Sequence, residues 1–447
     1  MNILVIGQTS LHWGRMEFGN IGNFYVMDPF FKELKRVFPK AQIKTTIQMS
    51  EGFSTENGII VIPLDLYYSW DDPDYLTKCF SEYGKALLYN KTGAMDNPSA
   101  FTKEVMDSDL VIDMSGDVWG DNADFTGENR FLIGLLKDRV AQLLKRKVVM
   151  IAGSPGPFEN HWNLLPFIKE VFEGFNFVTN RERLSVEILH GYGINTDKVR
   201  SYACPAFLFE GTPDSEIEEI IQKEKIVIPG KATVGVIICG WNMSEGPYSK
   251  WPRADSEYNV FAEMVEFLVN ELDLRVVLLS HNNGFERTPD FKLVHGRDFP
   301  IAKQLFENVI CRGKVTPENI HLVEEVYTPK QMKTLISHFD MLISGRVHGS
   351  VAGLSQNVPT VLIDYGHEPK AHKIRGFAQL LQVEEYLADP GNINDIKSKV
   401  SNCYDNSNAY RDHLKAIIPT IQGLSRQNFE DLRIFEEQLD KEGVRQK

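Results

Sequence analysis

Short apolar runs alternate with amphipathic stretches along most of the chain. Residues 28–38 and 131–144 place apolar side chains on one face at helical spacing. Because strands that alternate with crossover helices form parallel sheets, the first half of the chain is predicted to be an α/β domain. Its apolar runs of strand length are residues 2–7, 109–114, 147–152 and 176–179.

The alternation stops at residues 210–231, where turn residues and an acidic polar helix replace the apolar pattern. We therefore expect an N-terminal domain at residues 1–212 and a C-terminal domain with terminal helices at residues 213–447, each long enough to bury its own core. The expected fold class is α/β, with two Rossmann-like domains and a cleft between them. Apolar runs resume at residues 234–240, 274–281, 320–327, 341–344 and 360–365.

Charge and cysteine content narrow the possible partners. The formal net charge of -13 leaves no basic excess for a phosphate backbone, so we expect no nucleic-acid partner. The five cysteines form no Cys-x-x-Cys pair, and neither cysteines nor histidines show metal-ligand spacing, so no metal is expected. No apolar run reaches the ~20 residues of a membrane-spanning helix, and the first run lacks the basic region of a secretory signal. We therefore expect a cytoplasmic protein with no integral membrane segment.

The most informative motif is Arg346 and His348, which follow the apolar run at residues 341–344 and precede small residues including Gly349 and Ser350. Ligands of open α/β sheets bind at this edge, where a helix N-terminus offers N–H groups to an anion. Arginine can hold a carboxylate or phosphate at two points, and histidine can exchange a proton near neutral pH. The motif favours an anionic substrate and acid–base catalysis. Alternatively, Arg346 pairs with a carboxylate of the fold and His348 caps a helix.

Other candidate residues also follow predicted strands. The loop at residues 19–22 has glycines that permit close backbone approach, as phosphate loops do, although a tight turn is the alternative. Ser115 and Asp117 lie where acidic residues could bind or deprotonate a sugar hydroxyl, or act as local caps. Arg181 opens a helix after a strand and is expected to face the same cleft.

Residues 63–89 interrupt the alternation and are rich in aromatic residues and aspartate, including Tyr68 and Trp70. Sugar rings stack well on aromatic side chains, so one interpretation is a platform for a sugar acceptor. The other interpretation is a helical cap that packs over the sheet.

Taken in order, these motifs resemble those of the polysaccharide pyruvyl transferase family. The resemblance covers most of the chain, and several ordered matches are more specific than any one of them. The matching segments are Gly19-Asn20-Ile21-Gly22, Ser115-Gly116-Asp117, Arg181 with Ser185, Arg346-Val347-His348-Gly349 and Lys373-Ile374-Arg375-Gly376-Phe377.

The resemblance implies a fold similar to the GT-B glycosyltransferases and transfer of a pyruvyl group from phosphoenolpyruvate to a sugar or lipid-linked glycan, with no cofactor. It implies that Arg346 and Arg181 hold the anionic groups of the donor and that His348 is the general acid or base. The other donor-side candidates are Gly349, Ser350 and Lys373, and the acceptor and loop candidates are Gly19, Asn20, Gly22, Ser115 and Asp117.

Two other functions fit the same sequence. A glycosyltransferase with a nucleotide-sugar donor would use the same architecture and a donor that is also a phosphate ester. A catalytically inactive relative would bind a ligand without transferring it. His348 favours an enzyme, because it is the residue that an inactive relative would be expected to lose.

Overall fold

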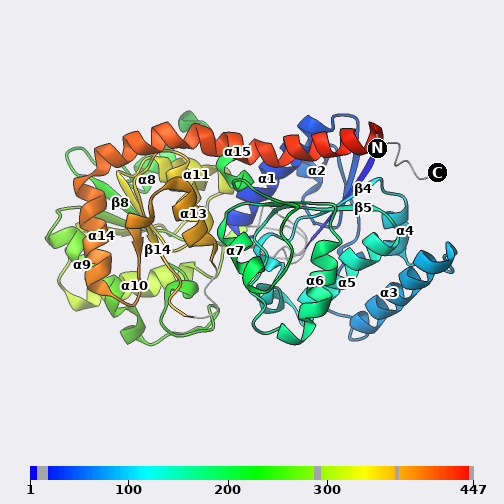
Figure 1. The fold of residues 1–447 in the computed structure, drawn as a ribbon. Helices are drawn as coiled ribbons and strands as arrows, with labels where there is room; N and C mark the ends of the chain where they lie inside the picture. The colour runs from blue at the N-terminus through cyan, green and yellow to red at the C-terminus, as the bar shows by residue number, and fades with distance from the viewer. Residues whose placement is uncertain (8–18, 286–292, 368–371, 442–447) are drawn as a thin grey trace. The chain divides into compact units, whose positions relative to one another are not determined.

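The computed structural model of the protein describes residues 1–7, 19–285, 293–367 and 372–441 (Figure 1). The chain forms two compact units. Unit 1 takes its residues from Met1–Met16, Asp28–Pro205 and Gly423–Lys447, and unit 2 takes its residues from Glu17–Met27 and Ala206–Gln422.

The division of the chain into units follows two long helices. The sequence predicted a single boundary between residues 212 and 213. In the structure, residues 17–27 belong instead to unit 2, and residues 423–447 belong to unit 1. This assignment arises because α1 (Ile21–Val37) and α15 (Ser407–Lys441) each begin in unit 2 and end in unit 1.

Unit 1 is built on a parallel sheet with the strand order β3-β2-β1-β4-β5-β6-β7. Strands β4 and β5 consist almost wholly of buried residues, as a parallel sheet covered on both faces requires. The apolar runs predicted as strands in the first half are confirmed. The strands are β1 (Asn2–Ile6), β2 (Gln42–Thr45), β3 (Ile59–Val61), β4 (Leu110–Asp113), β5 (Lys147–Gly153), β6 (Phe177–Asn180) and β7 (Val199–Ser201).

The aromatic stretch at residues 63–89 supports the helical-cap interpretation. Tyr68 and Tyr75 are buried in the same core as Phe131. The Tyr68 hydroxyl donates to the carbonyl of Glu128 at 3.0 Å, which ties the stretch to the chain just before α5. The helices of unit 1 after α1 are α2 (Glu51–Asn57), α3 (Tyr75–Thr92), α4 (Ala100–Met106), α5 (Arg130–Leu143), α6 (Leu165–Glu173) and α7 (Leu184–Gly191).

Unit 2 contains a second parallel sheet, with the order β12-β9-β8-β13-β14-β15. The apolar runs predicted in the second half form strands here, although β8, β9 and β12 end several residues before the predicted limits. The strands are β8 (Thr233–Ile237), β9 (Arg275–Leu278), β12 (Ile320–Leu322), β13 (Met341–Ser344), β14 (Thr360–Ile363) and β15 (Leu387–Ala388), and β10 (Asn283–Phe285) pairs antiparallel with β11 (Leu293–His295).

Helices complete unit 2, and the predicted helical end of the chain is confirmed. They are α8 (Glu218–Lys223), α9 (Asn259–Asn270), α10 (Phe299–Arg312), α11 (Pro329–Ser337), α12 (Val347–Leu354), α13 (Lys373–Leu381), α14 (Ile393–Asp405) and the first part of α15. The expected fold class, α/β with two Rossmann-like domains, is therefore confirmed, and the cleft between them stays a prediction.

Each sheet has one point at which the order of strands reverses. In unit 2 the chain runs from β8 through β9 to β12, and then returns to the other side of β8 as β13. In unit 1 the same reversal separates β1 from β4. Ligands of open α/β sheets bind outside the carboxyl ends of the strands at such a point. The residues after β13 and after β4 are therefore the places to search for a site.

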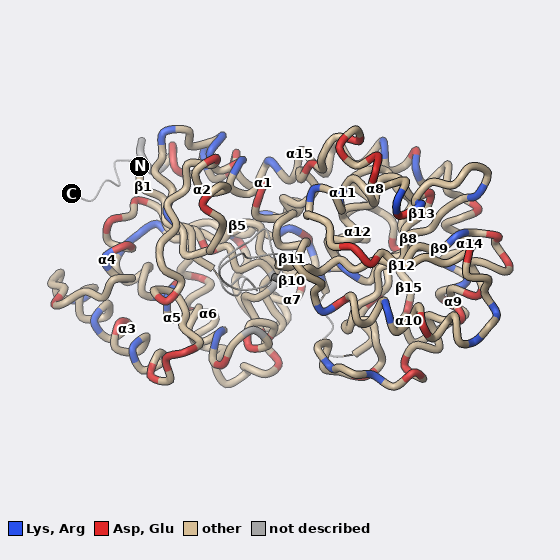
Figure 2. The backbone as a smooth tube through the Cα atoms, turned by 180° about the vertical axis from the view of Figure 1, so that it is seen from behind, with Lys and Arg blue, Asp and Glu red and all other residues tan. Residues whose placement is uncertain are grey.

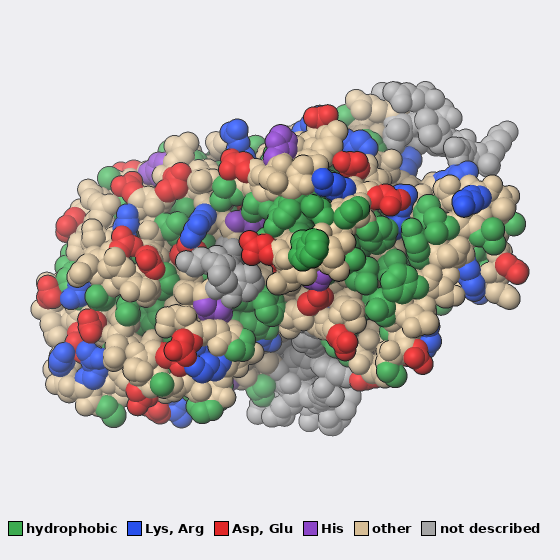
Figure 3. Space-filling view, turned by 60° about the horizontal axis from the view of Figure 1, so that its bottom comes forward, with side chains coloured by type: hydrophobic (Ala, Val, Ile, Leu, Met, Phe, Trp, Pro, Cys, Tyr) green, Lys and Arg blue, Asp and Glu red, His purple; other side chains and the backbone are tan. Residues whose placement is uncertain are grey.

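Charged residues of both signs are interspersed along the backbone in Figure 2 and over the face shown in Figure 3. Within the described ranges, none of the helices combines the length and the apolar character needed to cross a membrane. The same residues contain no group of three or more His, Cys, Asp or Glu side chains arranged to hold a metal ion.

Candidate active site

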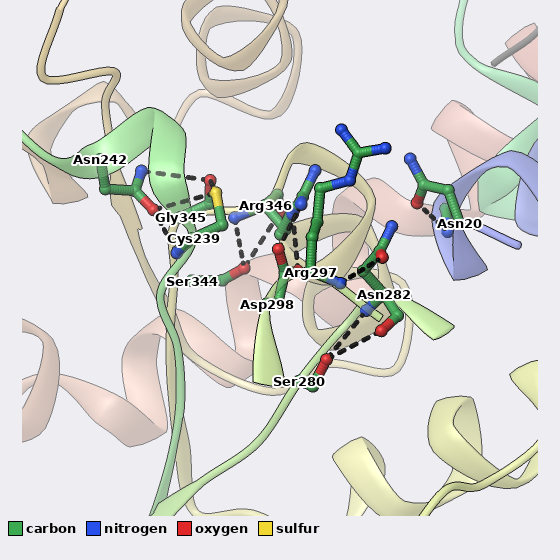
Figure 4. Close-up of polar contacts among 11 residues, drawn as sticks. Asn20, Cys239, Asn242, Ser280, Asn282, Arg297, Asp298, Ser344, Gly345 and Arg346 are labelled. Carbon is green, nitrogen blue, oxygen red and sulfur yellow. Dashed lines mark hydrogen bonds and ion pairs between the residues drawn. The ribbon is translucent and has the colours of Figure 1, made fainter. Parts of the chain in front are cut away.

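Asn242 joins the carboxyl ends of three strands in unit 2 through hydrogen bonds, and Figure 4 shows those to Cys239 and Gly345. Its Nδ2 donates to the carbonyls of Gly345 at 3.2 Å and Asp364 at 3.1 Å. Its Oδ1 accepts the backbone N–H of Cys239 at 2.9 Å. A Cβ atom on Gly345 would lie 1.9 Å from Asn242 Oδ1, so this position requires glycine. These contacts fix the backbone immediately before Arg346.

Arg346 forms a two-point ion pair with Asp298, which precedes α10. The Arg346 Nε donates to Asp298 Oδ2 at 2.8 Å, and Nη2 contacts Oδ1. Asp298 is fully buried and the Arg346 side chain is 14% exposed. Burial lowers the pKa of Arg346, but the Asp298 carboxylate more than offsets this effect and raises the pKa above its usual value. Arg346 is therefore charged, and the pair as a whole carries no net charge.

His348 lies in the first turn of α12 and packs against the start of α1. A Cβ atom on Gly22 would lie 2.7 Å from His348 Nδ1 and 2.8 Å from its Cβ. The side chain of Asn20, which follows Gly19, accepts the Gly22 N–H at 3.0 Å and so shapes the entry to α1. The loop and the histidine, which the sequence placed in different domains, meet in unit 2.

The small residues after His348 shape the helix. The buried Ser350 hydroxyl donates to the carbonyl of Arg346 at 3.1 Å. A Cβ atom on Gly349, the third residue of α12, would lie 2.8 Å from Ser344 Oγ, so the close packing here favours glycine. Lys373 is the first residue of α13 and is half-buried. A donor contact by Gly349, Ser350 or Lys373 stays a prediction.

Three titratable side chains form a buried cluster beside this site. The rings of Tyr25 and His281 are 5.3 Å apart, and Lys333 Nζ lies 5.7 Å from the Tyr25 ring centroid. Burial first, and then the charges of Arg346 and Lys333, lower the pKa of His281 to about 3. Burial lowers the pKa of Lys333 to about 7. His281 is therefore neutral near pH 7 and adds no charge to the site.

Arg297 and Asp298, which follow β11 and precede α10, were not predicted from the sequence. The Arg297 N–H donates to Asn282 Oδ1 at 3.1 Å. The guanidinium of Arg297 lies 5.0 Å from the ring centroid of Tyr248. The available signal was their place directly before the amphipathic run 299–312, since β11 belongs to the antiparallel pair and not to the parallel sheet.

In unit 1 the structure brings the Ser115 turn and Arg181 together. Asp113 Oδ1 accepts the Ser115 N–H at 2.9 Å, and Oδ2 accepts its hydroxyl at 2.8 Å. Gly116 has a φ of +61°, and a Cβ atom there would lie 3.5 Å from Arg181 Nη2. The Arg181 Nε donates to Ser154 Oγ at 2.8 Å. These contacts favour turn chemistry at Ser115, and the donor role of Arg181 stays a prediction.

Asp117 lies in the 3-10 turn Gly116–Val118, and its side chain lies outside the described part of the structure. Its predicted contact with an acceptor sugar therefore stays a prediction. Burial raises the pKa of the neighbouring Asp113 to about 7, despite the hydrogen bonds from Ser115.

His161 is held between two aspartates in unit 1. Its Nδ1 lies 2.7 Å from Asp121 Oδ1, and its Nε2 lies 2.9 Å from Asp124 Oδ2. Hydrogen bonds to Asp121 first, and then to Asp124, raise the pKa of His161 to about 9. Both ring nitrogens are thus engaged and the imidazole is protonated near pH 7, so His161 joins two segments and does not act as a base.

Comparisons with known proteins point to one family. The model of the family described as polysaccharide pyruvyl transferase matches residues 20–367. The amylovoran biosynthesis protein AmsJ of Erwinia amylovora is 25% identical over 311 residues, which are 68% of each chain.

Solved structures show the shared fold. A glycosyltransferase from Rickettsia africae is 12% identical, with a TM-score of 0.58 and coverage of 98% of both chains. HepE of Anabaena in complex with UDP and glucose is also 12% identical, with a TM-score of 0.57 and coverage of 97% of this chain and 99% of its own. These neighbours have the GT-B architecture, which the sequence predicted. Because the family match spans most of the chain, the protein belongs to the polysaccharide pyruvyl transferase family and is a transferase.

Proposed function

We propose that the protein moves the pyruvyl group of phosphoenolpyruvate onto two hydroxyls of a sugar, as a cyclic ketal, during polysaccharide or glycan synthesis in the cytoplasm. One observation carries the proposal: His348 packs against the loop at Gly22, two residues from the charged Arg346, at the reversal point of the unit 2 sheet. A proton-exchanging group beside a fixed cation suits a donor that is both anionic and activated by protonation.

In the proposed reaction, His348 as an imidazolium gives its proton to C3 of phosphoenolpyruvate, and the C2–C3 double bond supplies the electron pair. One sugar hydroxyl then bonds to C2, and its proton returns to His348. The bond between C2 and the phosphate oxygen breaks. A second hydroxyl bonds to C2, and its proton leaves with the phosphate. The products are the ketal and inorganic phosphate, and His348 is restored.

In this scheme Arg346 binds and positions the donor. The Nε and Nη2 groups of Arg346 face Asp298, which leaves Nη1 for an anionic group of the donor. No metal or cofactor takes part in this scheme. The acceptor is a sugar, free or lipid-linked, and contacts with it by Ser115 or Asp117 stay predictions.

Donor choice tests the proposal directly. We would measure phosphate release from phosphoenolpyruvate with a panel of sugar acceptors, and in parallel the release of UDP from UDP-glucose. Acceptor-dependent phosphate release with a pyruvylated sugar as product is the expected result. UDP release without any use of phosphoenolpyruvate would instead support the glycosyltransferase alternative. Binding of phosphoenolpyruvate without turnover on any acceptor would support the inactive relative.

A further inference from the structure

The charge balance of unit 2 is incomplete if Arg346 alone binds the donor. Phosphoenolpyruvate carries a carboxylate and a phosphate, whereas the Arg346–Asp298 pair has no net charge. His348 is needed for proton transfer in the proposed function. Beside the predicted donor residues Arg181 and Lys373, a further cation next to this pair would therefore favour an anionic ligand at this edge.

We infer that Arg297 is a donor-binding residue that supplies this charge, an inference that rests on the proposed function. The Arg297 side chain is exposed, and among the residues that the structure describes no carboxylate forms an ion pair with it. Figure 4 shows its guanidinium beyond the Arg346–Asp298 pair, on the side that faces Asn20. Arg297 is thus a cation near Arg346 that, unlike Arg346, has no carboxylate partner among the described residues.

Two contacts hold Arg297 in this place. Its backbone N–H donates to Asn282 Oδ1 at 3.1 Å, and a Cβ atom on Gly296 would lie 2.1 Å from the same oxygen. Its guanidinium lies over the ring of Tyr248 at 5.0 Å, and that ring stacks on Trp241 at 4.4 Å. Stacking uses the face of the guanidinium, whereas its N–H donors lie in the plane and stay directed outward.

Asn20 adds a neutral hydrogen-bond donor, and Figure 4 shows it across from the Arg297 guanidinium. Because its Oδ1 accepts the Gly22 N–H at 3.0 Å, its Nδ2 is the end of the amide that remains for a ligand. In Figure 4 the Asn20 amide and the Arg297 guanidinium lie on the same side of the Arg346–Asp298 pair. The geometry suits an anionic group held between an arginine fork and an amide. Arg297 then adds a full positive charge to the contact that Arg346 Nη1 offers to the donor.

The test compares Arg297→Gln, Arg297→Lys and the matched control Lys303→Gln, which removes an exposed positive charge from the first half of α10. Calorimetry measures the binding of phosphoenolpyruvate and of inorganic phosphate, and steady-state kinetics separates KM from kcat. We expect Arg297→Gln to raise the dissociation constant of phosphoenolpyruvate by about 10- to 100-fold, with a smaller effect on kcat. Arg297→Lys restores part of the binding, because it keeps the charge but not the fork. Lys303→Gln binds normally.

The outcomes separate the inference from the proposed function. Normal binding of phosphoenolpyruvate by Arg297→Gln overturns the role of Arg297 and leaves the proposed function intact. Equal losses in Arg297→Gln and Lys303→Gln also overturn it, because they indicate a general charge effect. Failure of the unaltered protein to bind phosphoenolpyruvate overturns both. Circular dichroism of each variant confirms folding, which the exposed position of Arg297 should preserve.

Discussion

The carboxyl edges of the two sheets share a topology but differ in chemistry. After β4 in unit 1, the carboxylate of Asp113 is buried and engaged by Ser115, and Arg181 bonds to a neutral hydroxyl. After β13 in unit 2, the charged Arg346 and His348 are two residues apart in the chain. Figure 4 shows the exposed Arg297 near Arg346. The sheet order determines where a site can form, and the residues after each strand determine what it can do.

The largest difference is expected for the histidines. His348→Gln should lower turnover at saturating donor by about 100- to 10,000-fold, the range typical of a positioned acid or base. Thermal stability should change little. The matched control His190→Gln alters an exposed histidine of unit 1 and should keep full turnover. Near-normal turnover by His348→Gln would show that the histidine is structural.

Asp298→Asn removes the partner of a buried cation. Because Arg346 would remain charged and buried without its carboxylate, the free energy of unfolding should fall by about 3–5 kcal/mol. Urea denaturation measures this loss. The control Asp412→Asn breaks an exposed ion pair with Lys415 and should cost at most about 1 kcal/mol. Similar losses in the two variants would contradict the account of the Arg346–Asp298 pair.

Gly22→Ala should displace His348, since the new Cβ atom would lie 2.7 Å from Nδ1. A shift of about 1 Å in a reacting group can lower turnover by on the order of 100-fold, and we expect a loss of 10- to 100-fold in kcat. Gly84→Ala is the control, because nothing lies within 4 Å of a Cβ atom there. Unchanged kcat in Gly22→Ala would mean that the position of His348 does not matter.

The smallest effect is a pH dependence confined to unit 1. The pKa of His161 rises from 6.5 to about 9 in the folded protein, so its stabilisation is complete below pH 6.5 and is lost as the pH rises through 9. The free energy of unfolding of the unaltered protein should therefore exceed that of His161→Gln by about 2 kcal/mol at pH 6 and by less at pH 10. A difference that stays constant over this range would disprove the charged state of His161.

The sequence predicted the central strands well, and the reason is their burial on both faces. Strands such as β4 and β5 contain continuous apolar runs, at residues 110–112 and 148–152, which indicate a buried strand. The short outer strands β2 and β7 mix polar and apolar residues, whereas β3 is wholly apolar but only three residues long, so no long apolar run marks any of them. These strands became visible only through their pairing in the sheet.

The site was predicted in part, because its motifs are local but their contacts are not. The sequence identified Arg346, His348 and the loop at Gly22, and it allowed a carboxylate partner for Arg346. It could not identify Asp298 as that partner, since the pair joins residues 48 positions apart. The packing of Gly22 against His348 was also missed, because the start of α1 belongs to unit 2 whereas its remainder belongs to unit 1.

The central claim is that the unit 2 edge protonates phosphoenolpyruvate, and a deuterium experiment tests it most directly. The reaction would be run in D₂O with an accepted sugar, and the product methyl group analysed by mass spectrometry. The account predicts one deuterium in the methyl group per pyruvyl transferred by the unaltered protein and by Ser115→Ala, and a loss of this labelled product in His348→Gln. Phosphate release without deuterium in the methyl group of the product would contradict it.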